Sequence, residues 1–190
     1  MADDPNGALP PWRQLLQGAR KREGRSPSAR WLQLATVAAD GSPRVRTLVF
    51  RGWSAAASLD LLTDGRSAKA AELRLNPAVE VCWLLPKAKV QCRLRGVVQP
   101  LVPADAALAH HWQQLTPQGR ALWGWPAPGE PYSSDATWPE ELPEQEPPPS
   151  HFELLRVAIE RVEWLDLGCH PHRRTLWRAA DGWRECRLNP

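Results

Sequence analysis

The sequence predicts a mainly β protein, in which an antiparallel sheet of six to seven strands closes into a barrel with helices at its flanks. Runs rich in strand-forming residues recur along the chain, and most are joined by hairpin-length connections, which implies antiparallel pairing. The 190 residues are enough for one domain with one core. A sheet of this length protects its edges best by closing on itself.

The N-terminal segment, residues 1–25, is expected to carry a helix over 9–22. Pro11 suits the first turn, Trp12 and Leu16 recur at helical spacing, and Gly24 ends the helix. Residues 31–102 are expected to form the core strands of the barrel. The expected elements there are strands over 31–38, 44–53 and 59–63, a helix over 68–75, and strands over 79–85 and 89–98.

The second half of the chain has a different composition. A helix is expected over 104–115. Residues 123–150 are acidic and proline-rich, with almost no aliphatic residues, and are expected to form an irregular loop or a partly disordered insertion. The pattern returns in the C-terminal strands of residues 151–190, with strands expected over 152–167, 175–178 and 183–188.

Composition excludes several classes of protein. Hydrophobic residues make up 43% and charged residues 24%, as in soluble globular proteins, and no apolar run is long enough to cross a membrane. The formal net charge of +3 is unevenly distributed, since residues 1–99 hold 16 basic and 8 acidic side chains while residues 100–150 hold 1 and 7. The first half is therefore expected to hold any site for an anion.

The N-terminus is acidic and lacks the features of a signal peptide, which predicts a cytoplasmic protein. The cysteines show no metal-type spacing and are expected to be buried, reduced thiols: Cys82, Cys92, Cys169 and Cys186. The basic run Arg20-Lys21-Arg22 stands on no recognisable nucleic-acid module, so no nucleic-acid partner is expected.

A candidate phosphate site lies where a strand end leads into a helix. The helix start presents unpaired N–H groups and a positive dipole end, to which Thr63 and Ser67 add hydroxyls and Lys69 a charge. An arginine of the adjacent strand, which carries Arg44, Arg46 and Arg51 with the first two on one face, could complete this site with a bidentate contact. The alternative from these residues alone is a solvated strand face beside an ordinary capped helix.

The spacing of this stretch resembles a known family. The pyridoxamine 5′-phosphate oxidase superfamily of FMN-binding split barrels has similar residues in the same order and at the same separation. The matching positions are Leu34-Ala35-Thr36-Val37, Asp40-Gly41-Ser42-Pro43, Arg46, Thr63, Ser67, Lys69-Ala70, Asn76-Pro77, Gln91, Arg95-Gly96 and the closing Trp183…Arg187-Leu188-Asn189-Pro190.

The resemblance implies a set of FMN-binding residues. Arg46 and Lys69 would hold the phosphate with Thr63 and Ser67, although Ala68 replaces a family arginine. The strand segment Thr47, Leu48, Val49 and Arg51 would line the flavin, with Arg51 in place of a family lysine and on the opposite face from Arg46 unless a bulge intervenes. Gln91 would bond to the flavin ring. Arg173, or Arg174 if the register slips by one residue, would come from the second subunit of a homodimer.

The chain also departs from the oxidases. Cys169-His170-Pro171-His172 stands where they carry Arg-x-His, and the helix after the barrel strand offers Ala109, His110, His111 and Gln113 rather than their Tyr, Arg and Ser. The substrate phosphate site is therefore expected to be absent. The stretch Trp125-Pro126-Ala127-Pro128-Gly129 is instead similar to that of oxidase-related flavoproteins, and Trp123 and Trp125 could border the flavin.

The resemblance implies an FMN-dependent oxidoreductase, a homodimer that transfers hydride from an unknown small substrate to FMN, with no assignable catalytic side chain. The alternatives are a non-catalytic flavin carrier or sensor that binds a partner through the acidic segment, and a split barrel that uses heme or a deazaflavin. No metal is expected, because no second cluster accompanies Cys169, His170 and His172.

Overall fold

The computed structural model describes residues 9–99 and 106–190. Eight strands form one sheet: β1 (Trp31–Val37), β2 (Pro43–Ala55), β3 (Ser58–Asp64), β4 (Ala78–Leu85), β5 (Val90–Gln99), β6 (Phe152–Asp166), β7 (Arg173–Arg178) and β8 (Cys186–Leu188). The α-helices are α1 (Pro11–Glu23), α2 (Ala68–Leu75), α3 (Ala106–Gln113) and α4 (Pro117–Ala121), and short 3₁₀ turns are η1 (Pro27–Ala29), η2 (Leu122–Gly124) and η3 (Ala179–Asp181).

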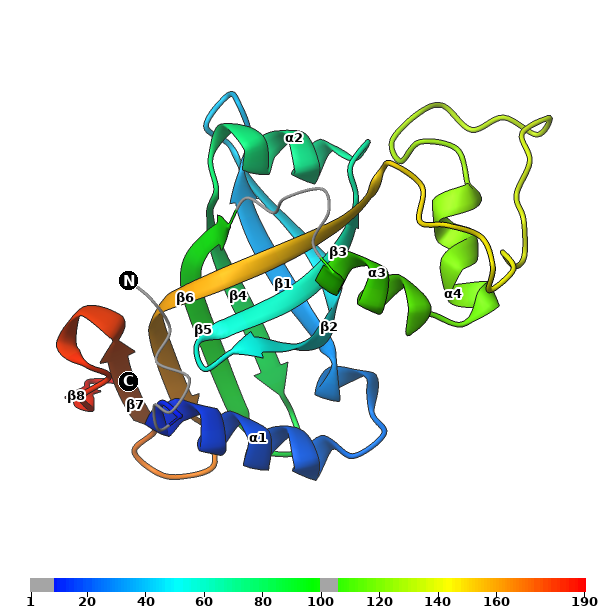
Figure 1. Cartoon of the computed structure of the whole chain (residues 1–190). Helices are drawn as coiled ribbons and strands as arrows, with labels where there is room; N and C mark the ends of the chain where they lie inside the picture. Colours follow the sequence, from blue (N-terminus) through cyan, green and yellow to red (C-terminus); the bar gives the residue numbers. More distant parts are fainter. Residues whose placement is uncertain (1–8, 100–105) are drawn as a thin grey trace.

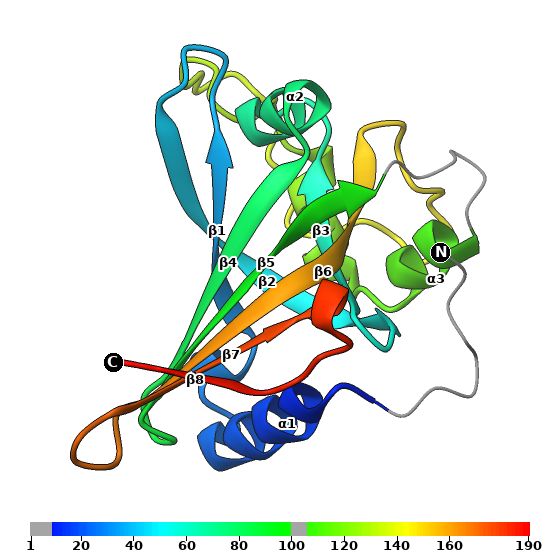
Figure 2. The same ribbon diagram turned by 90° about the vertical axis from the view of Figure 1, so that its left-hand side faces the viewer.

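The sheet closes into a six-stranded antiparallel barrel, in the order β3-β2-β1-β4-β5-β6 (Figure 1). The long strand β6 closes it, because its first half pairs with β3 and residues 156–166 pair with β5. The end of β6 also pairs with β7, which carries β8 outside the barrel (Figure 2). The predicted fold class is confirmed, with β7 and β8 as strands beyond the closed six.

The barrel is split between β2 and β3. Residues 43–49 of β2 pair with β1, but β3 pairs only with Phe50 to Ala55. Phe50 pairs with Leu61 and Gly52 with Asp60, so Arg51 is the extra residue of a β-bulge. The strand edge before this bulge therefore faces no neighbouring strand.

A close contact between strands fixes a second bulge, where β5 meets β6. The register shifts between Arg95 and Gly96, and a Cβ atom on Gly96 would lie 1.9 Å from the carbonyl oxygen of Ala158. Only glycine fits this approach of two backbones. The Arg95-Gly96 pair of the sequence thus has a structural reason for its glycine.

Helices α1 and α2 lie at opposite ends of the barrel (Figures 1 and 2). Trp12, Leu16 and Ala19 of α1 are buried in the barrel core, among inward-facing aliphatic residues of the strands. The helical spacing of these residues is the pattern that predicted the helix. Helix α2 contributes Leu73 to the same core, and its N-terminus lies next to the end of β3.

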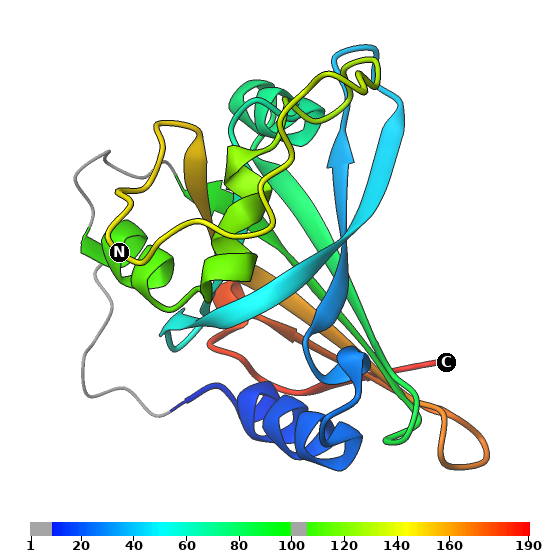
Figure 3. The ribbon, with the colours of Figure 1, turned by 90° about the vertical axis from the view of Figure 1, so that its right-hand side faces the viewer.

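A second core lies outside the barrel. It comprises Leu62, Trp112, Leu115, Trp123, Phe152 and Leu154, which come from β3, α3, the α3–α4 connection, η2 and β6. Helices α3 and α4 and the irregular segment after them lie on this side of the barrel (Figure 3). Strand β3 is buried on both faces as a result, since each face meets a different core.

Several sequence expectations need correction. Helix α4 was not expected, and β8 begins at Cys186 rather than at residue 183, because Trp183 adopts a positive φ of 59° in a turn. All four cysteines are free, but only Cys92 is buried and Cys186 is exposed on the edge strand β8. Beyond Gly124, residues 125–150 contain neither helix nor strand, as expected. Residues 1–8 and 100–105, including the expected helix start at 104, lie outside the described residues.

Candidate functional site

A cation with hydroxyl partners lies at the start of α2. The ammonium group of Lys69 donates to the Oγ atoms of Thr63, at 2.9 Å, and Ser67, at 3.1 Å. Burial lowers the pKa of Lys69 below its ordinary value, and repulsion from Arg46 adds to this effect. No carboxylate within the described residues forms an ion pair with Lys69. We call Thr63, Ser67 and Lys69 the cradle.

The cradle suits an anion such as a phosphate. Thr63 ends β3 and Ser67 precedes the first turn of α2, where backbone N–H groups lack partners in the helix. The hydroxyl of Ser67 donates to the carbonyl of Asp64 at 2.6 Å and forms no side-chain cap bond to the helix, so the N–H groups of that first turn are not capped by it. The structure thus brings together the three residues that the spacing placed here.

Arg46 lies in the same neighbourhood but already has partners. Its guanidinium donates to Glu72 of α2 at 2.8 Å and to the hydroxyl of Thr36. The hydrogen bond from Thr36 lowers the pKa of Glu72, burial opposes this, and Arg46 lowers it further. Glu72 thereby holds Arg46 at the barrel end next to α2, and it neutralises one of the two cations there.

The open edge of β2 explains how a planar ring could bind beside the cradle. Phe50 donates its N–H to the carbonyl of Arg30 at 2.8 Å, on the side of β1. Because successive N–H groups of a strand alternate in direction, those of Thr47 and Val49 point to the opposite edge. That edge has no β3 partner. The side chain of Leu48 packs against the barrel core.

Arg51, at the bulge, carries a guanidinium Nε that no described residue satisfies. Its Nε atom is buried and forms no hydrogen bond to any described residue. Burial lowers the pKa of Arg51, and repulsion from Arg30 adds to the effect. A buried unpaired donor is costly for a folded protein unless a ligand satisfies it. The bulge at Arg51, which the sequence alone could not decide, is present in the structure. The guanidinium of Arg51 is available to an anionic or carbonyl group.

Gln91 lies on the opposite face of the sheet from Arg46. Arg46 is in register with Leu34, Val81 and Leu94 across four strands, and those three leucine and valine side chains are buried inside the barrel. Gln91 is three residues from Leu94, so its side chain faces outward. From the position of Arg46, Gln91 is displaced by about 10 Å along the strands, which is three residues, and by about 14 Å across the sheet, which is three strand spacings. One chain does not bring Gln91 to the cradle.

The same reasoning separates Arg173 from Arg174. Gln91 is in register with Leu165 and Arg174, so these three share the outward face. Arg173 is in register with Asp166 and Val90, and Val90 is buried in the barrel core. Arg174 is thus the arginine on the Gln91 face, where it donates to Glu163.

The helix residues that depart from the oxidases lie on α3, in the outer region, by which we mean α3, α4 and residues 122–150 around the second core. His111 Nε2 contacts Asp60 at 3.0 Å, and Arg156 binds the same carboxylate through two bonds, at 3.0 and 3.1 Å. Burial opposes ionisation of Asp60, but hydrogen bonds from His111, Arg156 and Ser54 outweigh it and lower its pKa to about 2. This cluster attaches α3 to β3 and β6.

Other predicted residues of this region are not gathered into a site. Ala109, His110 and Gln113 are exposed on α3. Trp123 is buried in the outer core, while Trp125 packs edge to face against Trp138 and its carbonyl accepts from Arg66 at 3.0 Å. Within residues 9–99 and 106–190 no three metal-binding side chains come together, and His172 bonds to the carbonyl of Cys169 instead.

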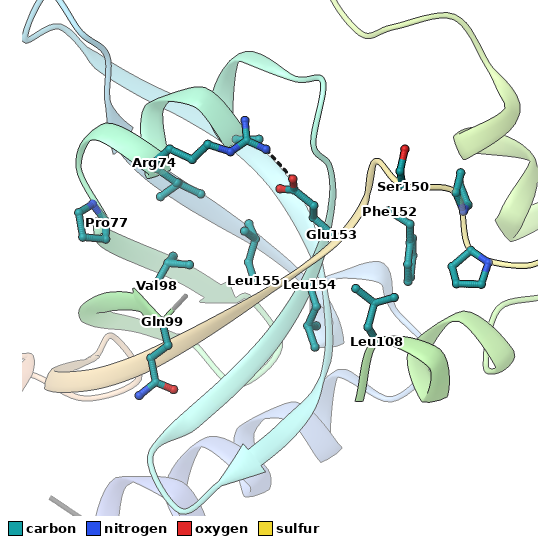
Figure 4. Close-up of a pocket in the computed structure, with 14 residues that line it drawn as sticks. Arg74, Pro77, Val98, Gln99, Leu108, Ser150, Phe152, Glu153, Leu154 and Leu155 are labelled. Atoms are coloured by element: carbon teal, nitrogen blue, oxygen red, sulfur yellow. Dashed lines mark hydrogen bonds and ion pairs between the residues drawn. The ribbon is translucent and has the colours of Figure 1, made fainter. Parts of the chain in front are cut away.

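A cavity of about 810 Å³ lies beside α2 and the ends of β5 and β6. Figure 4 shows Pro77, Val98 and Leu155 along it, with an ion pair between Arg74 and Glu153. Its lining is otherwise apolar apart from Gln99 and Ser150. It holds none of the predicted site residues.

Comparisons with known proteins identify the family of the chain. Residues 9–101 match the family model described as pyridoxamine 5′-phosphate oxidase, FMN-binding domain. The pyridoxine/pyridoxamine 5′-phosphate oxidase 2 of Arabidopsis thaliana is 31% identical over 165 residues, which cover 83% of each chain. The chain belongs to the pyridoxamine 5′-phosphate oxidase-like, FMN-binding split-barrel family.

Solved structures of this family support the fold. A pyridoxamine 5′-phosphate oxidase-related, FMN binding protein from Nostoc punctiforme is 34% identical, with a TM-score of 0.88 over 97% of this chain and 100% of that one. PhzG from Burkholderia lata, solved with tetrahydrophenazine-1-carboxylic acid, is 20% identical with a TM-score of 0.78 and shows the fold alone. The family expected from the sequence is confirmed.

The sequence reasoning missed two acidic residues around the predicted cations. Glu72 binds Arg46 and Glu163 binds Arg174. The only signal for Glu72 was its place one turn after Ala68 in the α2 sequence, and the only signal for Glu163 was a charge within an apolar strand. Neither signal identifies the arginine that the carboxylate binds.

Proposed function

We propose that this protein binds FMN between the cradle and the open edge of β2, and that it is an FMN-dependent oxidoreductase. The observation that carries the proposal is Lys69, a half-buried cation at the start of a helix, which has hydroxyl partners and forms no ion pair with a described carboxylate, although Asp64 and Glu72 are near enough to act on its charge. A phosphate there satisfies Lys69, the hydroxyls and the helix N–H groups together. Family membership and the unpartnered Nε of Arg51 support it independently.

Bound FMN would supply the redox chemistry by accepting a hydride at its ring. The chain's own residues bind and orient the cofactor. Lys69, Thr63 and Ser67 hold the phosphate, and the free N–H groups of Thr47 and Val49 bond to polar atoms at the ring edge. Arg51 stabilises negative charge on the ring or on a bound substrate. None of these steps needs a general base.

We also propose a homodimer, because Gln91 and Arg174 cannot reach the cradle of their own chain. The outward face beside them exposes large apolar side chains on three adjacent strands: Trp31 of β1, Val45 of β2 and Leu84 of β4 are 53%, 69% and 46% exposed. Val45 is in register with Ala35, four residues along β1 from Trp31, so these side chains are spread along the face, and exposed apolar side chains on a sheet face are typical of a protein interface. Across it, Gln91 and Arg174 would contact the flavin of the partner subunit.

The substrate site is proposed to differ from that of the oxidases. Helix α3 exposes Ala109 and Gln113 where the oxidases hold a substrate phosphate, and His111 is occupied by Asp60. We therefore expect weak or no turnover of pyridoxamine 5′-phosphate. Turnover at rates typical of these oxidases would show that this part of the proposal is wrong.

The test begins with the visible spectrum of the purified protein, with added FMN where none copurifies. A flavin spectrum that persists after gel filtration is expected, and a protein that stays colourless refutes the proposal. Stopped-flow mixing of the reduced, FMN-loaded protein with O₂ and with pyridoxal vitamers then separates an enzyme from a flavin carrier. Reoxidation that no acceptor accelerates supports the carrier.

A further inference from the structure

A small polar pocket lies on the outer face of the barrel, away from the cradle. Its volume is about 150 Å³, and it is lined by Glu80, Arg93, Arg95, Arg161 and Glu163. These residues come from β4, β5 and β6, which are neighbours in the sheet. We call this the arginine pocket.

Glu163 is the fixed centre of the arginine pocket. Its side chain is 7% exposed and binds three guanidinium groups, those of Arg93 at 2.7 Å, Arg161 at 2.5 Å, and Arg174. Burial opposes its ionisation, but hydrogen bonds from Arg174 and Arg161 and the charge of Arg93 outweigh this and lower its pKa to about 2. Three cations are thereby held around one anion.

The positive charge around Glu163 is not neutralised by the described residues. Arg95 is directly opposite Arg161 in the β5–β6 pair, a like-charge arrangement that destabilises a sheet. Arg95 forms no described ion pair or hydrogen bond, although Glu80 lies directly opposite it in the β4–β5 pair, and Glu80 contacts Arg93 at 3.3 Å. Four arginines therefore face two carboxylates, which leaves two positive charges in excess.

Free donors line the mouth of the arginine pocket. Arg161 uses only one Nη atom, towards Glu163, and the guanidinium of Arg95 uses none. The bulge at Arg95, fixed by Gly96, brings these two arginines to the same point of the outer face. Guanidinium groups in this number and geometry suit an oxyanion, which accepts several charge-assisted hydrogen bonds at once.

We propose that the arginine pocket binds a small oxyanion, either a free phosphate or the phosphate or carboxylate group of a larger ligand. Arg95 and Arg161 are its principal donors, and Glu163 holds Arg161 and Arg93 in place. The five residues that line the pocket are not among those proposed to hold FMN, although Glu163 also binds Arg174, which the proposed dimer directs to the partner's flavin. Phosphate binding is therefore measured with FMN already bound.

The test is isothermal titration of the purified protein with inorganic phosphate at low ionic strength, where surface charges are least screened. FMN-loaded protein is used so that the cradle is filled. The same titration in Lys69→Ala protein keeps the test valid if no FMN binds. Binding is expected in both, and the Arg95→Ala/Arg161→Ala double variant should bind at least tenfold more weakly.

Two controls complete the experiment. Arg25→Ala removes an exposed arginine elsewhere and should bind phosphate like the wild type. Phenyl phosphate distinguishes the sources of the oxyanion, since tighter binding than phosphate indicates a larger ligand and equal binding indicates free phosphate.

Absence of phosphate binding to the wild type overturns the proposal, as does equal binding by the double variant. If the double variant instead loses its dimer while the wild type binds no phosphate, the arginines belong to the subunit interface and the proposal is also overturned.

Discussion

The molecule has two cores that were built in different ways. The inner core fills the barrel mostly with aliphatic side chains that alternate along six strands, with Phe50, Trp83 and Trp177 among them, and Trp12 of α1 closes one end. The outer core lies between β3, β6 and the α3–α4 region, and half of its six members are aromatic: Trp112, Trp123 and Phe152. Their rings pack edge to face at 4.8 to 6.0 Å.

The outer core shows how residues 125–150, which contain neither helix nor strand, are held in place. Indole N–H groups bind backbone carbonyls of distant residues: Trp112 donates to Glu146 at 2.7 Å and Trp125 to Pro139 at 2.9 Å. His151 likewise contacts the carbonyl of Trp123 at 2.8 Å. Proline lacks an N–H donor, and side-chain donors take over the role of ladder hydrogen bonds. This accounts for part of the unusual tryptophan content of 11 residues.

The largest expected effects come from replacing one tryptophan in each core with alanine, because the two replacements should destabilise different parts of the chain. Trp12→Ala should lower the free energy of unfolding of the whole chain by about 3–5 kcal/mol, because Trp12 is fully buried in the inner core. Trp112→Ala should instead loosen the outer region while the barrel stays folded. Urea unfolding measures the first effect and limited proteolysis the second. Equal midpoints without new cleavage in residues 123–150 would contradict the division into two cores.

A glycine pair tests the packing of the barrel itself. Gly96→Ala should destabilise the protein by about 3 kcal/mol, because the new methyl group meets a backbone carbonyl that cannot move aside. Gly18→Ala is the matched control, since Gly18 lies inside α1 with open space around it. That change should stabilise by about 0.5–1 kcal/mol. Thermal melts measure both, and a Gly96→Ala protein as stable as the wild type would refute the close approach at the bulge.

A smaller loss of stability is expected at Asp60, which joins α3 of the outer region to β3 and β6 of the barrel. Asp60→Asn should cost about 1.5 kcal/mol at neutral pH, because Asp60 accepts charge-assisted bonds from Arg156 and contacts His111. The folded-state pKa of Asp60, about 2, is below its ordinary value of 3.8, so this stability is present above pH 4 and is lost as the pH falls to 2.

Urea unfolding between pH 2 and 7 measures the difference in the free energy of unfolding between the wild type and the Asp60→Asn variant. Asp135→Asn is the control at an exposed position. A difference between wild type and Asp60→Asn that grows below pH 4 would contradict the assignment.

The barrel was more predictable than the outer region for a physical reason. A strand with one buried face must alternate, and a residue before proline rarely continues a helix, so β1 and the end of α2 at Asn76-Pro77 follow from local rules. Helix α4 has five residues and no apolar stripe, and contacts with residues far along the chain hold the outer region. Contacts between residues far apart in the sequence leave no periodic pattern of hydrophobic residues.

The site was predictable to the same extent. Thr63, Ser67 and Lys69 are close in sequence, and the strand-to-helix turn places them together. The partner of Arg46 is 26 residues away on another element, and the separation of Arg173 from Arg174 depends on the register of three strands. Spacing alone could not fix either.

The central claim is that the cradle holds the phosphate of FMN. Titrations of FMN and of riboflavin, which lacks the phosphate, into wild-type and Lys69→Ala protein test it most directly, with Arg25→Ala as control. The wild type should prefer FMN. Lys69→Ala should weaken FMN binding by about 1.5–3 kcal/mol, roughly 10- to 150-fold, and leave riboflavin binding unchanged. Equal losses for both flavins, or no loss for either, would contradict the claim.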